Sequence, residues 1–232
     1  VNLEKYETFS TIGVAQDITI NNCLIYGNNL GTGQSIIQAY LGSSRETTDN
    51  AKATIINSTI VYNGDRFLNI ASESQIDINI YNSIIVGDFY AGDNTNYDKV
   101  YVHNSALTDT GLPPSINIIN PVLVFTTDDF VNYAGGDYSI DANSVAHSAG
   151  SNDLWNANSN NVTTDAAGNP RIYDDGAIGE PIIDIGAYEV QSVRQRVRNI
   201  DTGVWYETIQ SALDNVAEGE TISRDSGTFA GR

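Results

Sequence analysis

The chain of 232 residues has one cysteine, two histidines and no methionine. A single cysteine, Cys23, excludes an intramolecular disulfide, and two histidines, His103 and His147, make a histidine-based zinc site improbable. No apolar run is long enough to cross a bilayer as a helix, so no direct membrane span is expected. The absence of methionine, even at the first position, indicates a processed or excised piece of a longer polypeptide.

Basic residues are scarce as well. The 11 Lys and Arg residues face 29 Asp and Glu residues, which gives a formal net charge of −18. Because nucleic acids and anionic membranes repel such a chain, neither is expected as a partner. The acidity suits solubility outside the cell, and a solvated acidic surface is the simplest explanation for it. No cofactor is predicted, although the acidity is compatible with cations such as Ca²⁺.

What the chain does contain is a fourfold repeat. Alternating apolar residues lead to an asparagine, a small residue and further apolar residues. The repeats are residues 18–25, 53–60, 78–85 and 100–107, with the asparagines Asn22, Asn57, Asn82 and Asn104. Four and two residues before each asparagine the side chains are apolar, which indicates a strand with one buried face. After the asparagine the inward set moves to the first and third following positions.

This shift of phase predicts a bend at each asparagine. A straight strand would keep its inward residues in phase, and asparagine tolerates the left-handed backbone of a tight bend better than most residues. Cys23, Ser58, Ser83 and Ser105 would then occupy a shared inward position. The asparagines are 35, 25 and 22 residues apart, which fits the circuits of a solenoid.

Two strands, an asparagine bend and a further apolar segment in each interval resemble the right-handed parallel β-helix family, whose coils carry three strands. The resemblance covers residues 1–110, which we assign to the coils of an all-β fold. The alternative is a β-sandwich with short strands, which requires no repeated corner of asparagine and a small residue.

Residues 111–190 have a different composition, rich in Asp, Asn, Ala and Gly, and are expected to close the last coil as an irregular C-terminal cap. Their motifs occur in a fixed order: Gly136-Asp137-Tyr138, Ser148-Ala149-Gly150, Asp165 to Arg171, and Asp184-Ile185-Gly186-Ala187-Tyr188-Glu189. This order resembles the C-terminal part of bacterial β-helix proteins of the choice-of-anchor Q domain family. Val145-Ala146-His147 departs from the family pattern.

Structural roles suit the residues of this cap. Gly168 and Gly186 are suited to tight turns or close backbone approach. Arg171 is expected to pair with Asp165 or Asp184, and the ring of Tyr188 to fold over the last coil. The same acidic residues could instead form a catalytic carboxylate pair, which we consider the weaker interpretation.

Residues 191–232 have a different pattern from the cap that precedes them. Residues 193–198 alternate, with three arginines on one face, as in an exposed linking strand. Apolar spacing predicts a short amphipathic helix within residues 208–217, with Gly219 as its stop. The order of helix and following Gly-Thr-Phe is similar to the opening of pectate-lyase-like β-helices, in which a helix covers the first coil. A second module is therefore expected to start here.

Evidence for an enzyme is weak. The chain has no phosphate-binding loop, nucleophile elbow or dinucleotide fingerprint. The best candidate for ligand binding is an exposed group near neighbouring corners: Tyr40, Asp65, Arg66, Asp88 and Tyr90. Exposed tyrosines such as Tyr26 and Tyr81 could also stack on sugar rings.

The sequence thus favours a non-catalytic structural or adhesive module of a large exported bacterial surface protein. Its expected partners are other copies or modules of that protein, and a polysaccharide is the alternative partner. The alternative functions are a carbohydrate-active enzyme, either a polysaccharide lyase or a glycoside hydrolase, and a sugar-binding module.

Overall fold

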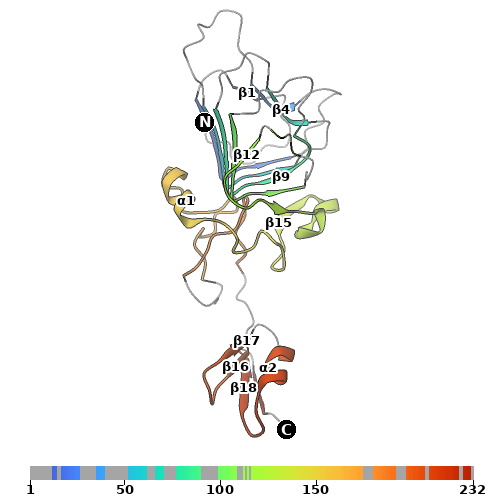
Figure 1. Ribbon diagram of the computed structural model, residues 1–232, viewed down its shortest axis with the longest axis vertical. Coiled ribbons are helices and arrows are strands. Elements are labelled where there is room, and N and C mark those ends of the chain that lie inside the picture. Colours follow the sequence, from blue (N-terminus) through green and yellow to red (C-terminus); the bar gives the residue numbers. More distant parts are fainter. Residues whose placement is uncertain are drawn as a thin grey trace, which may run out of the picture. The chain divides into compact units, whose positions relative to one another are not determined.

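The computed structural model describes residues 12–14, 17–26, 35–39, 52–61, 66–70, 77–89, 99–108, 112, 114, 116–174, 180–191, 197–206, 209–224 and 227–230. The chain divides into two compact units, Val1–Tyr173 with Pro181–Gln191, and Asp174–Glu180 with Ser192–Arg232. The first unit holds three parallel sheets, and the second holds one antiparallel sheet and a helix (Figure 1). The prediction of an all-β fold is confirmed at this level.

Each of the three sheets collects strands from successive stretches of the chain. Sheet one contains β1 (Ile12–Val14), β4 (Ser35–Ala39) and β7 (Arg66–Ile70). Sheet two contains β2 (Ile18–Asn21), β5 (Lys52–Ile56), β8 (Asp77–Tyr81), β10 (Val100–His103) and β12 (Asn117–Ile118). Sheet three contains β3 (Leu24–Ile25), β6 (Thr59–Val61), β9 (Ile84–Val86), β11 (Ala106–Leu107) and β13 (Leu123–Val124).

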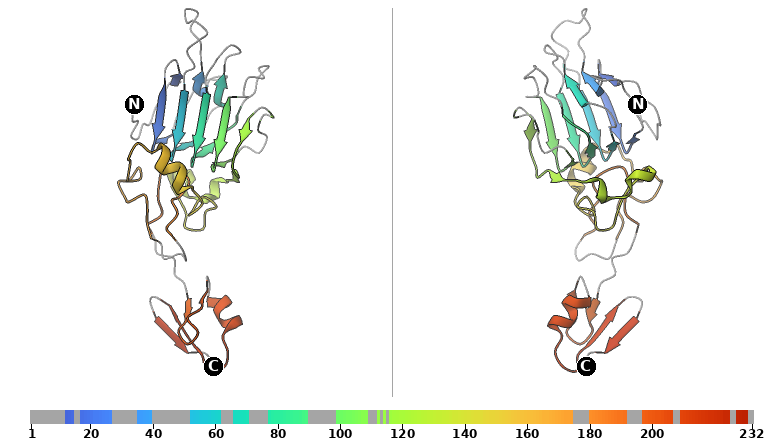
Figure 2. Two further views of the ribbon diagram at one scale, coloured as in Figure 1. Left: turned by 60° about the vertical axis from the view of Figure 1, so that its left-hand side comes forward. Right: turned by 90° about the vertical axis from the view of Figure 1, so that its right-hand side faces the viewer.

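The chain visits the sheets in the order one, two, three, in three complete circuits, and all neighbouring strands are parallel. Figure 2 shows the strands of sheet two side by side, coloured from blue to green. After these circuits β10 and β11, and then β12 and β13, extend sheets two and three. The repetitive part therefore continues past residue 110, the boundary expected from the sequence.

The four asparagines form the bends between sheets two and three. Asn22, Asn57, Asn82 and Asn104 have φ angles of 56°, 45°, 44° and 47°, all in the left-handed region. The backbone N–H groups of Asn22, Asn57 and Asn82 also join the next circuit, as in the 3.0 Å bond from Asn22 to the carbonyl of Ile56. This geometry matches the bend that the phase shift predicts.

The small residue after each asparagine forms a ladder inside the coil. Cys23, Ser58, Ser83 and Ser105 are all almost completely buried. The hydroxyl of Ser83 donates to the carbonyl of Tyr81 (2.7 Å) and accepts the N–H of Ser58 (3.1 Å). Ser58 and Ser105 repeat both contacts with their own neighbours. Each circuit is thus joined to the preceding one by a buried side-chain contact, besides the strand pairing.

We expect Ser83→Ala to lower the free energy of unfolding by about 1–3 kcal/mol, because it leaves the buried N–H of Ser58 without its acceptor. The measurement is urea unfolding followed by circular dichroism. The control is Ser139→Ala, which removes a hydroxyl that contacts exposed Asp137 and should change stability little. Equal effects of the two substitutions would contradict the ladder.

Two apolar clusters lie on opposite faces of sheet three. Alternate residues Ile25, Ile60, Ile85 and Leu107 point into the core enclosed by the three sheets. Their neighbours point the other way, into a second cluster that includes Leu24, Val61, Ile84, Val86 and Ala106. The other buried members of the second cluster come from residues 125–173 and 181–190, which we call the covering segment. Strands β3, β6, β9 and β11 of sheet three are therefore buried on both faces.

The covering segment is mostly irregular. Its regular elements are η1 (Thr127–Asp129), β14 (Phe130–Asn132), η2 (Tyr133–Gly135), β15 (Asp137–Ile140) and α1 (Asn152–Asn158). Strands β14 and β15 form an antiparallel pair, and Ser151 caps α1 by accepting the N–H of Leu154 (3.3 Å). The rings of Phe125, Phe130 and Tyr138 pack edge to face and contribute to the second apolar cluster.

The second unit is a small sheet with one helix. Its antiparallel strands are ordered β17 (Trp205–Tyr206), β16 (Val197–Asn199), β18 (Thr221–Arg224) and β19 (Gly227–Ala230). Helix α2 (Ile209–Asn215) packs Ala212 against Val197 and Ile222. The predicted helix is confirmed, and Gly219 has a φ of +89° beyond its end. The described strands here are antiparallel, whereas a starting coil would contribute parallel ones.

Candidate functional site

The covering segment lies along the asparagine bends. Three bend asparagines donate their side-chain Nδ2 to backbone carbonyls of this segment. The pairs are Asn22 with Thr164 (2.8 Å), Asn82 with Ser151 (3.0 Å) and Asn104 with Ala149 (2.8 Å). Asn82 also accepts the N–H of Ser151 through Oδ1 (2.9 Å). Residues 149–164 therefore run alongside the bends, from Asn104 beside Ala149 to Asn22 beside Thr164. The expected role of residues 111–190 as a cap on the last coil stays a prediction.

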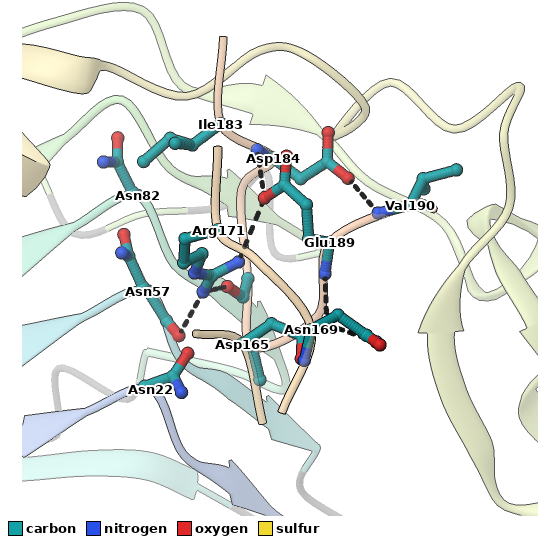
Figure 3. A network of polar contacts seen from close by, with 12 residues as sticks. Asn22, Asn57, Asn82, Asp165, Asn169, Arg171, Ile183, Asp184, Glu189 and Val190 are labelled. Atoms are coloured by element: carbon teal, nitrogen blue, oxygen red, sulfur yellow. Dashed lines mark hydrogen bonds and ion pairs between the residues drawn. The ribbon is translucent and has the colours of Figure 1, made fainter. Parts of the chain in front are cut away.

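Arg171 contacts the remaining bend, at Asn57. Its side chain is completely buried, and its guanidinium donates through Nη2 to the backbone carbonyls of Asn57 (3.0 Å) and Gly186. Nη1 lies 3.5 Å from Oε2 of Glu189. Figure 3 shows Arg171 between the bend of Asn57 and residues 183–190, which we call the strip and which carry Glu189. One side chain thus joins a coil bend to two places in the covering segment.

Asp165 and Asp184 are the expected partners of Arg171, but among the described residues neither forms an ion pair with it. Their oxygens instead accept backbone N–H groups. The donors are Ala167, Asn169 and Glu189 for Asp165 (2.9, 2.8 and 3.0 Å), and Ser148 and Val190 for Asp184 (both 2.6 Å). These carboxylates fix the local turns of the covering segment, and the ion pair of Arg171 is with Glu189.

The charges of this network do not balance if every acid is ionised. Asp165, Asp184 and Glu189 are all buried around the single cation Arg171. Burial raises the pKa of Glu189 to about 8, with a further upward contribution from Asp184 that Arg171 only partly opposes. Burial also raises the pKa of Asp184, and burial lowers that of Arg171. Arginine still keeps its proton, so a proton retained by Glu189 brings the cluster closer to neutrality.

The raised pKa of Glu189 makes stability pH-dependent. Between its ordinary value of 4.5 and about 8, the folded chain holds a proton that the unfolded chain has released. The free energy of unfolding should therefore fall as the pH rises through this window, by at most about 1.4 kcal/mol per pH unit from this group. We expect Glu189→Gln, which cannot ionise, to have a shallower decline. Urea unfolding of both proteins from pH 5 to pH 8 measures this, and parallel curves would contradict it.

Close backbone approach joins the same strip to sheet three. The N–H of Gly186 donates to the carbonyl of Asn82 (2.9 Å), and the N–H of Ala187 donates to Oγ1 of Thr59 (2.9 Å). Gly186 has a φ of +107°, and a Cβ there would lie 2.6 Å from Cδ1 of Ile84. The predicted close approach at Gly186 is found. Gly168 has a φ of +88° in a turn with open space around it.

Tyr188 packs against the second apolar cluster, on the outer face of sheet three. Burial raises its pKa, with smaller contributions from Asp137, Asp165 and Tyr26. The fold of its ring over the last coil stays a prediction.

A polar pocket of about 570 Å³ opens beside the first described bend. Asn21 and Asn22 contribute from the coil, and residues 161–168 contribute from the covering segment. Sequence reasoning did not find this pocket. Its one sequence signal is Asn21, a polar residue next to the bend where the second and third repeats have Ile56 and Tyr81.

The predicted ligand-binding group is only partly visible. Tyr40, Asp65 and Tyr90 lie outside the described residues, and only the backbone of Arg66 is described, at the start of β7. Asp88 is exposed, and its carbonyl accepts the N–H of Phe67 (2.8 Å), so it lies beside β7 in the next circuit. The grouping of these five residues stays a prediction.

The tyrosines proposed for sugar stacking are engaged with other rings. Tyr26 contacts Tyr138 with ring centroids 5.1 Å apart, and Tyr81 contacts His103 at 4.7 Å. Tyr81 and His103 lie directly opposite each other on β8 and β10 of sheet two. Both rings are half-buried.

Comparison with known proteins gives no relative. No protein-family model, curated protein or solved structure matches this chain. Within the described ranges, no helix is long and apolar enough to cross a membrane. Among those same residues, no three His, Cys, Asp or Glu side chains are arranged to hold a metal ion.

Proposed function

We propose that this chain is a non-catalytic structural module of a large exported bacterial surface protein. We further propose that its first unit is a right-handed parallel β-helix of the pectate-lyase-like kind, and that residues 111–190 are of the choice-of-anchor Q type. The three parallel sheets visited in a fixed order support the first assignment, and the strong right-handed preference of parallel crossovers supports its handedness. The motifs from Gly136 to Glu189 support the second.

One observation supports the structural role: the polar groups most typical of an active site are engaged in structural contacts, within the covering segment and, through Arg171, with the coil. Arg171 donates to two backbone carbonyls and contacts Glu189. Both oxygens of Asp165 and of Asp184 accept backbone N–H groups. All four side chains are buried. Such a network stabilises one arrangement of bends and covering segment, and a rigid scaffold requires that property.

Two further expectations belong to the same proposal. The module is extracellular or on the cell surface, and its strong net negative charge suits solubility there. Its partners are other copies or modules of the same protein. The alternative with a specific observation behind it is a sugar-binding module, because the polar pocket offers amide and hydroxyl groups.

The test is to image the intact native protein by electron microscopy, in its natural assembly. The proposal predicts ordered filaments or lattices in which this module meets its neighbours. Limited proteolysis of intact cells, followed by mass spectrometry, should release its peptides without lysis. Isolated monomers, together with turnover of a polysaccharide by the purified protein, would contradict the proposal in favour of an enzyme.

A further inference from the structure

The last circuit of the coil leaves two core positions exposed. Ile118 of β12 stands in register with Val102 of β10, and Val124 of β13 stands in register with Leu107 of β11. Val102 and Leu107 belong to the core enclosed by the three sheets and are 0% and 1% exposed. Ile118 and Val124 are 45% and 64% exposed. Because residues in register on neighbouring strands share a face of the sheet, two columns of core side chains end at this surface.

The opposite ends of the same two columns are buried. The columns begin at Ile20 of β2 and Ile25 of β3, in the first described circuit. Both side chains are only 1% exposed. The coil therefore differs at its two ends, and its core side chains are exposed only beside β12 and β13 among the described strands of sheets two and three. Stacked repeats require a covered end, so this surface calls for a partner.

The backbone of the last circuit suits such a partner. Strands β12 and β13 are the edge strands of sheets two and three. An edge strand presents N–H and C=O groups on its outer side, where a strand of another chain can pair with it. Ile119, directly after β12, is 53% exposed. We call the surface formed by Ile118, Ile119 and Val124 the coil end. It combines apolar side chains with backbone hydrogen-bonding groups.

The coil end is uncharged, which favours a second copy of this chain as its partner. The chain has a formal net charge of −18, so two copies repel each other wherever acidic surfaces meet. Residues 116–127 contain both edge strands and no charged side chain, and Asp128 and Asp129 follow in η1. Phe125 is the one aromatic residue of this stretch and is buried, so no ring is offered for stacking on a sugar.

We propose that two copies of this chain pair through the coil end, with the last circuit of one coil stacked on the last circuit of the other. A head-to-tail stack of coils is disfavoured, because Ile20 and Ile25 at the other end are already buried. A two-fold interface brings the same surface of both copies together, so Ile118 and Val124 of each copy cover those of the other. The choice of a second copy as the partner rests on the proposed structural role.

The first test is sedimentation velocity of the full chain over a range of micromolar concentrations, and we expect an equilibrium between monomer and dimer. Val124→Asp places two carboxylates opposite each other in the dimer and should weaken it by at least about a hundredfold. Ile118→Asp is the second variant. The matched control is Ala157→Asp, which adds the same charge at an exposed position of α1. The end of α1 contacts Asn21 of β2, in the first described circuit, so this control should dimerise normally.

Cross-linking distinguishes a two-fold pair from any other association. In the proposed dimer, position 124 of one copy lies near position 124 of the other. Val124→Cys should therefore give a covalent dimer with a short bismaleimide, and Ala157→Cys should not. The native Cys23 is almost completely buried and should not react. Circular dichroism checks that every variant is folded.

A chain that stays monomeric at every concentration would overturn the proposal. Self-association that Val124→Asp leaves intact would also overturn it, because the contact would then lie elsewhere. Association that gives no cross-link at position 124 would lack the two-fold symmetry and count equally against it. None of these results decides the structural role, which the imaging and proteolysis experiments test on the native assembly.

Discussion

Replacing Arg171 by alanine should lower the free energy of unfolding of the first unit by about 3–5 kcal/mol, the cost of removing one partner from a buried ion pair. The loss has two parts. Three buried acids lose the neighbouring positive charge of Arg171 and keep only their N–H donors, and Glu189 also loses its contact with Nη1. The carbonyls of Asn57 and Gly186 lose their shared donor at the contact between coil and covering segment. Urea unfolding followed by circular dichroism measures the change.

Two further variants show whether the loss of stability comes from the charge and the geometry of Arg171 or from the removal of any basic side chain. Arg171→Lys keeps the charge but cannot supply the planar fork of donors, so it should fall between the native chain and the alanine variant. Lys52→Ala removes an exposed cation at the start of β5 and should stay within about 0.5 kcal/mol of the native value. If Arg171→Ala were as harmless as Lys52→Ala, the buried network would not hold the unit together.

Gly186→Ala is expected to destabilise the unit by roughly 2–5 kcal/mol, from backbone strain and overpacking together. The new Cβ would meet Cδ1 of Ile84 at 2.6 Å and Oγ1 of Thr59 at 2.8 Å, and the φ of +107° disfavours any L side chain. Relief requires that the strip move away from sheet three, which would break the bond from Ala187 to Thr59. Thermal unfolding should show a clear fall in the melting temperature.

Gly168→Ala is the matched control. It has a similar positive φ of +88°, but no atom lies within 4 Å of the new Cβ. This variant should therefore show only the strain of the left-handed region, roughly 1–2 kcal/mol. The difference between the two glycines measures the close approach itself, and equal losses would show that sheet three does not press on Gly186.

The bends and the interior of the coil could be predicted because each depends on a local pattern. The move of the apolar positions across Asn57 or Asn82 is visible within eight residues, and it fixes both the bend and the inward position of Ser58 or Ser83. The sequence pattern does not predict the last circuit, because its corner contains Asn120-Pro121 in place of asparagine and a small residue. Strands β12 and β13 there are also only two residues long.

The position of the covering segment could not be predicted from the sequence. Its contacts join a side chain to a distant backbone carbonyl, as from Asn22 to Thr164 or from Arg171 to Asn57, and carbonyls have no sequence signature. For the same reason Arg171 was assigned to Asp165 or Asp184. Those acids bind backbone N–H groups instead, which leaves Glu189 as the ion-pair partner. The pocket arises only when these distant segments meet.

The use of the bend asparagines follows from this arrangement. A left-handed residue at the corner directs the side chain outward, and the amide then meets the covering segment, as at Asn82 and Ser151. The small residue that follows turns inward and joins adjacent circuits. One dipeptide thus makes contacts on both sides of the coil wall, which explains why the repeat requires both residue types.

The most direct test of the account is native-state hydrogen exchange measured by NMR. If the coil and the covering segment form one cooperative unit, the amides of Ile185, Gly186 and Ala187 should exchange with the same opening free energy as those of Asn57 and Asn82. Arg171→Ala should lower both sets together. Rapid exchange at residues 185–187 while the bend amides stay protected would show that the covering segment only rests on the coil, and would contradict the account.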